Sequence, residues 1–177
     1  ILAIDQGTTG TTVVLVDDKG KTVQKSSTEY RQIYPKPGWV EHSPEDIWKS
    51  VVAMIDQTLK KARVKGAQIA AIGITNQRET VVLWERKSHK AVHNAIVWQD
   101  RRTSEVCERL RAEGLSDMIR EKTGLVIDPY FSASKIQWLL TQMKGLRPKA
   151  ENGKLAAGTI DTFLVWRLTG GLAPKTD

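Results

Sequence analysis

The sequence has a single cysteine and no long hydrophobic run. Cys107 is the only cysteine among 177 residues, which excludes an internal disulfide and a multi-cysteine metal site. The apolar stretches at residues 69–74 and 81–84 have the length of strands, far short of the roughly 20 residues that cross a bilayer. We therefore predict no membrane span and a reduced, partly buried thiol, which fits the reducing cytoplasm.

The sequence also lacks the patterns of zinc sites and of nucleic-acid binders. The three histidines, His42, His89 and His93, do not have zinc-ligand spacing. There are 27 Lys and Arg against 20 Asp and Glu, a net charge of +7, but the basic residues are scattered among acidic ones. We therefore expect no nucleic-acid partner. Because the start at Ile1 has neither an initiator methionine nor a signal-peptide pattern, we expect a piece cut at both ends.

The first half of the chain has the pattern of a mixed α/β domain. Three β-rich segments joined by short turns predict an antiparallel meander of strands at residues 1–5, 11–16 and 22–30. Ser43 is a predicted helix N-cap followed by Pro44, and apolar residues at spacing four continue this helix towards Gly66. The almost wholly apolar segment 69–75 is predicted to be a centrally buried parallel strand.

The second half predicts a hairpin and then mainly helices. The hairpin strands are residues 80–85 and 95–98. The first helix follows Arg101 and has a buried stripe of Val106, Leu110 and Cys107, and a second helix lies at 115–122. A third helix is capped by Ser132 or Ser134. A strand at 154–157 and a helix at 161–168 follow it. This order matches a ribonuclease-H-like domain, the unit of actin-like and sugar-kinase ATPases, in which helices flank a mixed sheet.

The segment between the first two strands has the composition of a phosphate-binding turn. Gly7, Thr8, Thr9 and Gly10 follow the first strand; glycine lets backbone N–H groups approach a phosphate, and threonine adds hydroxyl donors. Asp5 at the strand end can hold Mg²⁺ directly or through water. A P-loop is excluded, because that motif ends in Gly-Lys-Ser/Thr before a helix. The alternative is an ordinary hairpin turn without a ligand.

Longer motifs resemble the FGGY carbohydrate kinases, and among them the glycerol kinases, over essentially the whole chain. They are DQGTT (5–9), YPKPGWVEH (34–42), GITNQRET (73–80), NAIVWQ with RR (94–99, 101–102) and TGLVIDPYFS (123–132). The resemblance implies that residues 1–177 are an incomplete N-terminal kinase domain, whose second, ATP-binding domain lies outside the chain. It also places the general-base aspartate beyond Asp177, so we expect no catalytic base here and no activity from this piece alone.

The resemblance assigns roles to individual residues. Arg78 and Glu79 match the arginine and glutamate that hydrogen-bond glycerol hydroxyls, and this pair supplies the donors and acceptors that a polyol needs. Tyr130 matches a third substrate contact, and Trp98 matches the ring that packs on the carbon face of glycerol. The turn residues named above match the site for the nucleotide phosphates, with Asp5 as the carboxylate linked to Mg²⁺.

The implied reaction is ATP-dependent phosphorylation of glycerol to sn-glycerol 3-phosphate, with ADP released, by an enzyme that is homo-oligomeric when full length. Two positions depart from the glycerol-kinase pattern. Thr12 replaces an arginine that reaches the nucleotide phosphates, and Asp100 is a residue more common in other FGGY sugar kinases. These departures leave xylulose, ribulose or erythritol open as alternative substrates. A non-catalytic actin-like module is a further alternative, although it would lack the four substrate residues.

Overall fold

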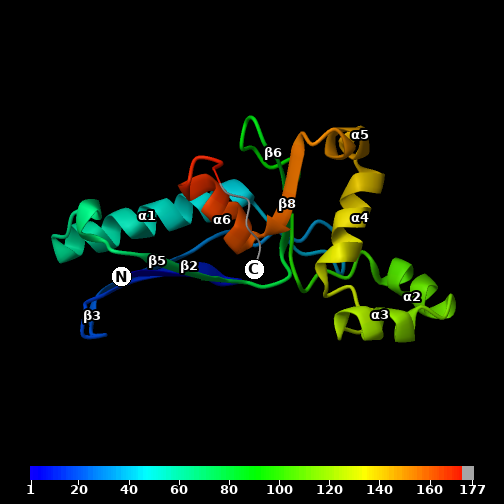
Figure 1. The fold of residues 1–177 in the computed structure, drawn as a ribbon, viewed down its shortest axis with the longest axis horizontal. Helices are drawn as coiled ribbons and strands as arrows, with labels where there is room; N and C mark the ends of the chain where they lie inside the picture. Colours follow the sequence, from blue (N-terminus) through cyan, green and yellow to red (C-terminus); the bar gives the residue numbers. More distant parts are fainter. Residues whose placement is uncertain (173–177) are drawn as a thin grey trace.

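The computed structural model describes residues 1–172, which form two four-stranded sheets with helices beside them (Figure 1). The strands are β1 (Leu2–Gln6), β2 (Gly10–Val16), β3 (Thr22–Glu29), β4 (Glu41–His42), β5 (Ile72–Asn76), β6 (Val81–Glu85), β7 (Ala95–Ile96) and β8 (Leu155–Thr159). The helices are α1 (Pro44–Ala62), α2 (Ser104–Ala112), α3 (Ser116–Thr123), α4 (Ser132–Gln142), α5 (Leu146–Glu151) and α6 (Ile160–Leu168), with a 3-10 turn at Gly66–Gln68.

Sheet A has the strand order β3-β2-β1-β5, which confirms the predicted meander. Strand β1 pairs antiparallel with β2 and parallel with β5. The prediction that the fourth strand is centrally buried is wrong for the described residues: β5 is the edge of sheet A, and Ile72 is 48% exposed. An apolar run indicates a parallel strand but does not say whether both of its edges are paired.

Helix α1 covers one face of sheet A. Ser43 caps it as predicted, because its hydroxyl accepts a hydrogen bond from the Asp46 N–H at 3.1 Å, and Pro44 occupies the first turn. The helix ends at Ala62, four residues before Gly66, where Arg63 adopts a left-handed conformation. The apolar side of α1 packs on the alternating buried residues of β1 and β2 to form the main core, which includes Leu2, Ile4, Val13, Leu15, Ile47 and Val51.

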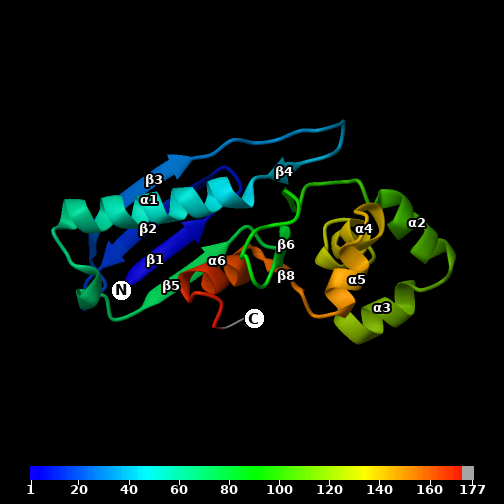
Figure 2. The same cartoon turned by 90° about the horizontal axis from the view of Figure 1, so that it is seen from above.

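Sheet B has the strand order β4-β7-β6-β8 and joins the two ends of the molecule. The predicted pairing of β6 with β7 is confirmed, whereas the two-residue strand β4 and helix α5 were not predicted. Strand β6 is buried on both faces: Trp84 packs with Phe163 of α6, and Leu83 packs in a second cluster with Leu139 of α4. Figure 2 shows α1 along sheet A at one end, α2–α5 at the other, and sheet B between them.

The helices after residue 101 follow the predicted order but differ in detail. In α2 the fully buried side chain is Cys107, whereas Val106 and Leu110 are only half-buried. Burial raises the pKa of the Cys107 thiol, consistent with a packing role. The predicted caps of α4 are wrong, because Phe131 is the N-cap and neither Ser132 nor Ser134 caps it. Both hydroxyls instead bind side chains from elsewhere in the chain.

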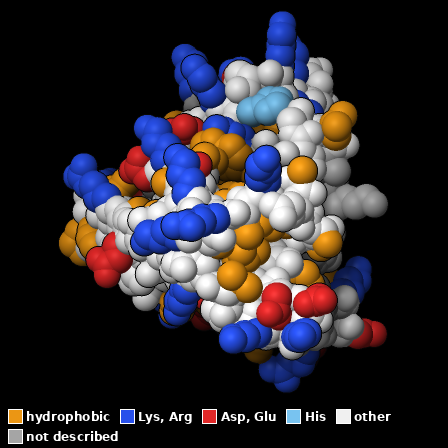
Figure 3. All heavy atoms as spheres, turned by 90° about the vertical axis from the view of Figure 1, so that its left-hand side faces the viewer, with side chains coloured by type: hydrophobic (Ala, Val, Ile, Leu, Met, Phe, Trp, Pro, Cys, Tyr) orange, Lys and Arg blue, Asp and Glu red, His pale blue; other side chains and the backbone are white. Residues whose placement is uncertain are grey.

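The surface shows how the positive charge is distributed. Figure 3 views the end formed by the last turns of α1 and the β2–β3 turn, where Lys and Arg side chains project over much of the face with Asp and Glu among them. On this face the charge is spread over separate side chains, in agreement with the scattered basic residues of the sequence. Within residues 1–172, the helices fall short of the length and apolar character that a membrane crossing requires.

Candidate functional site

The turn between β1 and β2 presents backbone N–H groups outward. The carbonyl oxygens of Gly7 and Thr8 point into the protein, where they accept hydrogen bonds from the Tyr30 hydroxyl at 2.5 and 2.9 Å. In a planar trans peptide the N–H points opposite to the C=O, so the N–H groups of Thr8 and Thr9 face away from Tyr30. Neither N–H has a backbone or side-chain acceptor in the described part of the chain. Two free donors on a turn suit an anion.

Buried side-chain amides hold Tyr30 in this position. Gln6 and Gln77 each donate a hydrogen bond from Nε2 to the Tyr30 hydroxyl, at 2.9 and 2.8 Å. Gln77 also donates to Gln6 Oε1 at 3.0 Å, and Thr80 donates to Gln77 Oε1 at 3.0 Å. The sequence motifs had indicated no role for Gln6 or Gln77. Gln6 is the last residue of β1 and Gln77 directly follows the adjacent parallel strand β5, and these positions could have indicated that the two side chains meet.

A second branch of the network reaches the turn from β4. Gln32 donates to the Thr8 carbonyl at 3.1 Å, and His42 Nε2 lies 2.6 Å from Gln32 Oε1. Burial lowers the pKa of His42 to about 4 and raises the pKa of Tyr30 to about 12. Both groups are therefore neutral at pH 7, so the turn is supported from within by hydrogen bonds without a buried charge.

Beside the turn is an open hollow of about 530 Å³ that contains the predicted metal residue. Asp5 is exposed and pairs across the sheet with Thr12, which in turn pairs with Ser27 of β3. No described Lys or Arg lines this hollow, and no cluster of three metal-ligating side chains occurs in residues 1–172. Two exposed carboxylates, those of Asp5 and Glu29, line the hollow. Such a lining fits Mg²⁺ that arrives with a nucleotide, because Mg²⁺ binds through one or two carboxylates and takes its other ligands from phosphates and water.

Gly10 has a packing role in this turn. A side chain at Gly10 would place its Cβ 2.4 Å from the backbone oxygen of Thr28, closer than atoms can approach. The close contact between β2 and β3 therefore requires glycine here whether or not a phosphate binds. Gly7 has no such restriction, since a Cβ at that position would lie an ordinary 3.5 Å from the Gly10 oxygen.

Two of the predicted polyol residues, Trp98 and Tyr130, are connected to the turn. The Trp98 indole donates from Nε1 to the Thr8 hydroxyl at 3.0 Å, and its ring contacts Tyr130 edge-on with a centroid distance of 5.9 Å. Arg78 and Glu79 line a hollow of about 430 Å³ at the end of β5, and neither Trp98 nor Tyr130 is among the residues that line it. Arg78 is exposed and has no hydrogen-bond partner in the described part of the chain, so its guanidinium remains available.

Helix α4 holds Glu79 from the other side. One carboxylate oxygen of Glu79 accepts hydrogen bonds from the N–H and hydroxyl of Ser132, at 2.9 and 2.7 Å. The buried ammonium of Lys135 donates to the backbone oxygens of both Glu79 and Tyr130. Sequence reasoning missed Ser132 as a partner of Glu79, and it missed Lys135 altogether. A lysine in the apolar stripe of a helix was the available signal.

Asp100 is buried and does not line the hollow that contains Arg78 and Glu79. Its carboxylate accepts hydrogen bonds from the Val40 N–H at 2.6 Å and from Arg102 at 2.8 and 2.9 Å. The side chain of Arg102 is fully buried, also binds Glu41 at 2.8 Å, and stacks on the ring of Trp39 at 3.9 Å. The departure at Asp100 is therefore accounted for by a buried ion-pair network and carries no information on the polyol.

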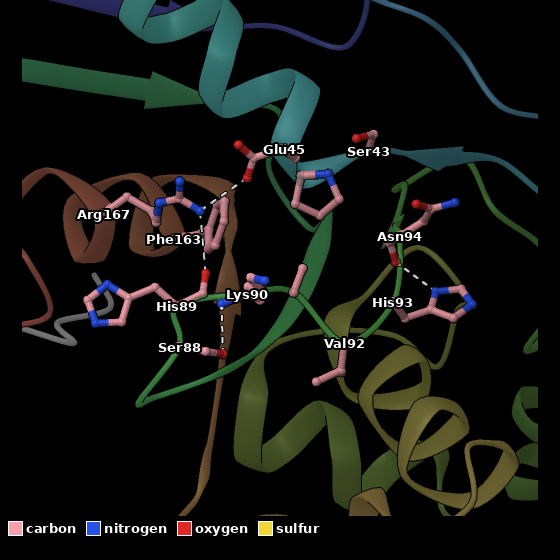
Figure 4. A pocket seen from close by; sticks show the side chains of 12 residues that line it. Ser43, Glu45, Ser88, His89, Lys90, Val92, His93, Asn94, Phe163 and Arg167 are labelled. Carbon is pink, nitrogen blue, oxygen red and sulfur yellow. Dashed lines mark hydrogen bonds and ion pairs between the residues drawn. The ribbon is translucent and has the colours of Figure 1, made fainter.

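A larger hollow, of about 770 Å³, lies apart from these residues (Figure 4). The N-terminal end of α1, the β6–β7 loop and α6 line it. Its guanidinium, that of Arg167, already binds the Glu45 carboxylate at 3.3 Å and the His89 backbone oxygen at 3.4 Å. None of the sequence-predicted site residues lies in this hollow, so we do not assign the substrate to it.

Comparison with known proteins identifies the family of this chain. The model of the FGGY family of carbohydrate kinases, N-terminal domain, matches residues 1–177. The chain belongs to this family. It is 55% identical over its whole length to the glycerol kinase of Bacillus cytotoxicus, of which it covers 36%. Its fold superposes on the crystal structure of Plasmodium falciparum glycerol kinase with ADP, with a TM-score of 0.91 and 37% identity over 96% of this chain and 34% of the other.

More distant FGGY kinases have the same fold, and their names give other substrates. The ligand-bound xylulose kinase of Lactobacillus acidophilus matches with a TM-score of 0.80 and 26% identity, over 94% of this chain and 32% of the other. The chain spans about a third of the length of the relatives it matches. Membership of the family confirms the predicted actin-like α/β fold class and leaves the substrate to be argued from the site.

The neutral state of His42 predicts a pH-dependent stability. Because its pKa is about 4 when folded and about 6.5 when unfolded, the unfolded chain binds more protons between these values. We expect the unfolding free energy to rise with pH across this window by up to about 3 kcal/mol, and the melting temperature to rise with it. In His42→Gln, whose amide can replace the donor to Gln32, this rise should be much smaller.

His89→Asn is the matched control for the pH measurement. His89 lies in the β6–β7 loop with a φ of 59°, a conformation that asparagine tolerates. The control should keep the wild-type slope of melting temperature against pH from 4 to 7. Parallel curves for wild type and His42→Gln would show that His42 does not carry the effect.

Proposed function

We propose that this chain is the N-terminal part of an ATP-dependent glycerol kinase and supplies its glycerol site and phosphate-binding turn. The observation that carries the proposal is the hydrogen bond from Trp98 to Thr8, which joins the predicted polyol residues to the predicted phosphate turn. A kinase must place an acceptor hydroxyl beside the phosphoryl group that it transfers. The 55% identity to a glycerol kinase supports glycerol as the acceptor.

The polyol residues offer complementary groups. Glu79 uses one carboxylate oxygen for Ser132, so the other remains to accept a hydrogen bond from a glycerol hydroxyl. Arg78 can donate to a hydroxyl oxygen from its free guanidinium. The paired rings of Trp98 and Tyr130 provide an apolar surface for the carbon chain. Together they would orient one terminal hydroxyl towards the phosphate turn.

The phosphate turn offers donors without a cation. The outward N–H groups of Thr8 and Thr9 would bind phosphoryl oxygens, and Asp5 would hold Mg²⁺ at the open hollow. When bound, Mg²⁺ neutralises charge on the phosphates. The Plasmodium glycerol kinase was crystallised with ADP, which supports a nucleotide ligand. We further propose, on the family resemblance, that the general base and a second, ATP-binding domain lie outside residues 1–177, and that the whole enzyme is cytoplasmic and homo-oligomeric.

A kinase for another polyol or sugar is the second candidate. The fold match to a xylulose kinase favours it, because the same domain serves both substrates in the family. Asp100, which the sequence pattern offered as a sign of other sugars, is committed to Arg102 and gives this candidate no support. The four polyol residues Arg78, Glu79, Trp98 and Tyr130 also favour a substrate-binding enzyme over a scaffold module.

A substrate panel tests the function. We expect the full-length protein to give its highest kcat/KM with glycerol when glycerol, erythritol, xylulose and ribulose are compared in a coupled ADP-release assay. A higher kcat/KM with one of the other three would establish the second candidate. Glycerol-dependent thermal stabilisation without any ADP release would identify a binding module that is not a kinase.

Substitution of the polyol pair should weaken glycerol binding. Loss of a hydrogen bond to a charged group costs about 1.5–3 kcal/mol, so we expect Arg78→Ala and Glu79→Gln each to raise the glycerol KM by roughly tenfold or more. Arg120→Ala, an exposed arginine on α3, is the control and should leave the glycerol KM unchanged. Wild-type glycerol kinetics in both site variants would remove these residues from the glycerol site.

An arginine introduced at position 12, in the hollow beside Asp5, should strengthen ATP binding. Thr12 lines the hollow beside Asp5, where no described cation is present, so Thr12→Arg would add a charge-assisted contact to phosphate. We expect the ATP KM to fall roughly fivefold to tenfold. Val16→Arg is on the same face of β2 but about 13 Å further from the turn, and it should have no effect. Equal ATP KM values for Thr12→Arg and wild type would contradict the placement of the phosphates.

A further inference from the structure

The first turn of α4 binds Glu79 at two separate points. Ser132 binds the side chain, through both its N–H and its hydroxyl, and Lys135 binds the backbone oxygen at 3.0 Å. These contacts fix the position of the Glu79 backbone and the direction of its carboxylate together. A side chain that is held at both ends keeps its free oxygen in one place, which is what a small polyol site requires.

Lys135 is unusual because it is a charged residue with no exposure to solvent. Its ammonium donates to the backbone oxygens of Glu79 and Tyr130, two of the predicted glycerol contacts that are 51 positions apart in sequence. Burial lowers its pKa to about 8, while the carboxylates of Glu79, Asp100 and Asp128 act to raise it. Most of the population is therefore charged at pH 7, with three N–H donors.

Glu79 needs this support because its backbone is strained. Its φ of 63° lies in the left-handed region, which costs a residue with a side chain about 1–2 kcal/mol. Such a conformation persists only where the surroundings hold it. Ser132 and Lys135 provide three hydrogen bonds to this one residue, which explains how the strain is maintained.

We propose that Ser132 and Lys135 are positioning residues that form a clamp, which orients Glu79 and sets its spacing from Tyr130 for polyol binding. The inference rests on the proposed function, because it takes Glu79 and Tyr130 as substrate contacts. The clamp makes its hydrogen bonds to Glu79 and Tyr130 and makes none to the phosphate turn among the described residues, so its effect should fall on the polyol. It acts through the polyol residues and does not touch the reacting atoms.

The test compares the KM for the polyol with the KM for ATP in the full-length enzyme. We expect Ser132→Ala to raise the polyol KM roughly threefold to tenfold and Lys135→Met to raise it at least tenfold, with the ATP KM within about twofold of wild type. Ser134→Ala is the control for Ser132, because that hydroxyl binds Thr103 instead. Leu139→Ala is the control for Lys135, because it is equally buried in α4 and should lower only thermal stability.

A double-mutant cycle distinguishes positioning from general packing. If Ser132 acts through Glu79, Ser132→Ala should change the polyol KM less than twofold in a Glu79→Ala background. Equal effects in both backgrounds, or a Lys135→Met enzyme that loses stability with an unchanged KM, would overturn the clamp. Should Lys135→Met fail to fold, the Ser132 cycle alone decides. These measurements use the member of the substrate panel that the wild-type enzyme phosphorylates best. If that substrate is not glycerol, the glycerol proposal is overturned, but the clamp can still be tested with it.

Discussion

The inward direction of the Gly7 and Thr8 carbonyls is the constraint on which the rest of the site depends. Because a trans peptide fixes its N–H opposite to its C=O, these two carbonyls decide where the donors of the turn point. Tyr30 fixes the carbonyls, and Gln6 and Gln77 fix Tyr30. The order β3-β2-β1-β5 is what brings these side chains to one place, so the sheet pairing determines the site.

The two halves of the candidate site are held by different forces. The phosphate turn rests on a neutral network, in which burial keeps His42 and Tyr30 uncharged, so no buried charge competes with the outward donors. The polyol half rests on charge, with Lys135 and Ser132 holding Glu79. The Trp98–Thr8 hydrogen bond joins the halves, so the proposed polyol site and the proposed phosphate site are in direct contact.

Local sequence signals predicted much of the fold. Turn residues and β-branched runs located the meander, and Ser43 with Pro44 located the start of α1, because these features act through neighbouring backbone groups. They failed where a distant partner decides the outcome. Ser132 has the composition of a helix cap, whose hydroxyl would accept a hydrogen bond from an N–H of the first turn of α4. Its N–H and hydroxyl instead donate to the Glu79 carboxylate, 53 positions away in the sequence. The exposure of β5 depends on which strands pair with it, and its apolar residues do not encode that.

The sequence by itself determined the family, and it singled out the proposed phosphate turn and the proposed polyol residues, because those motifs are contiguous. The tertiary structure alone decided what each residue touches. It showed that Gly10 is needed for contact with β3, that Asp100 belongs to a buried network, and that Lys135 links Glu79 to Tyr130. These roles arise between residues far apart in the chain, and hydrogen bonds at such distances depend on packing that no local pattern records.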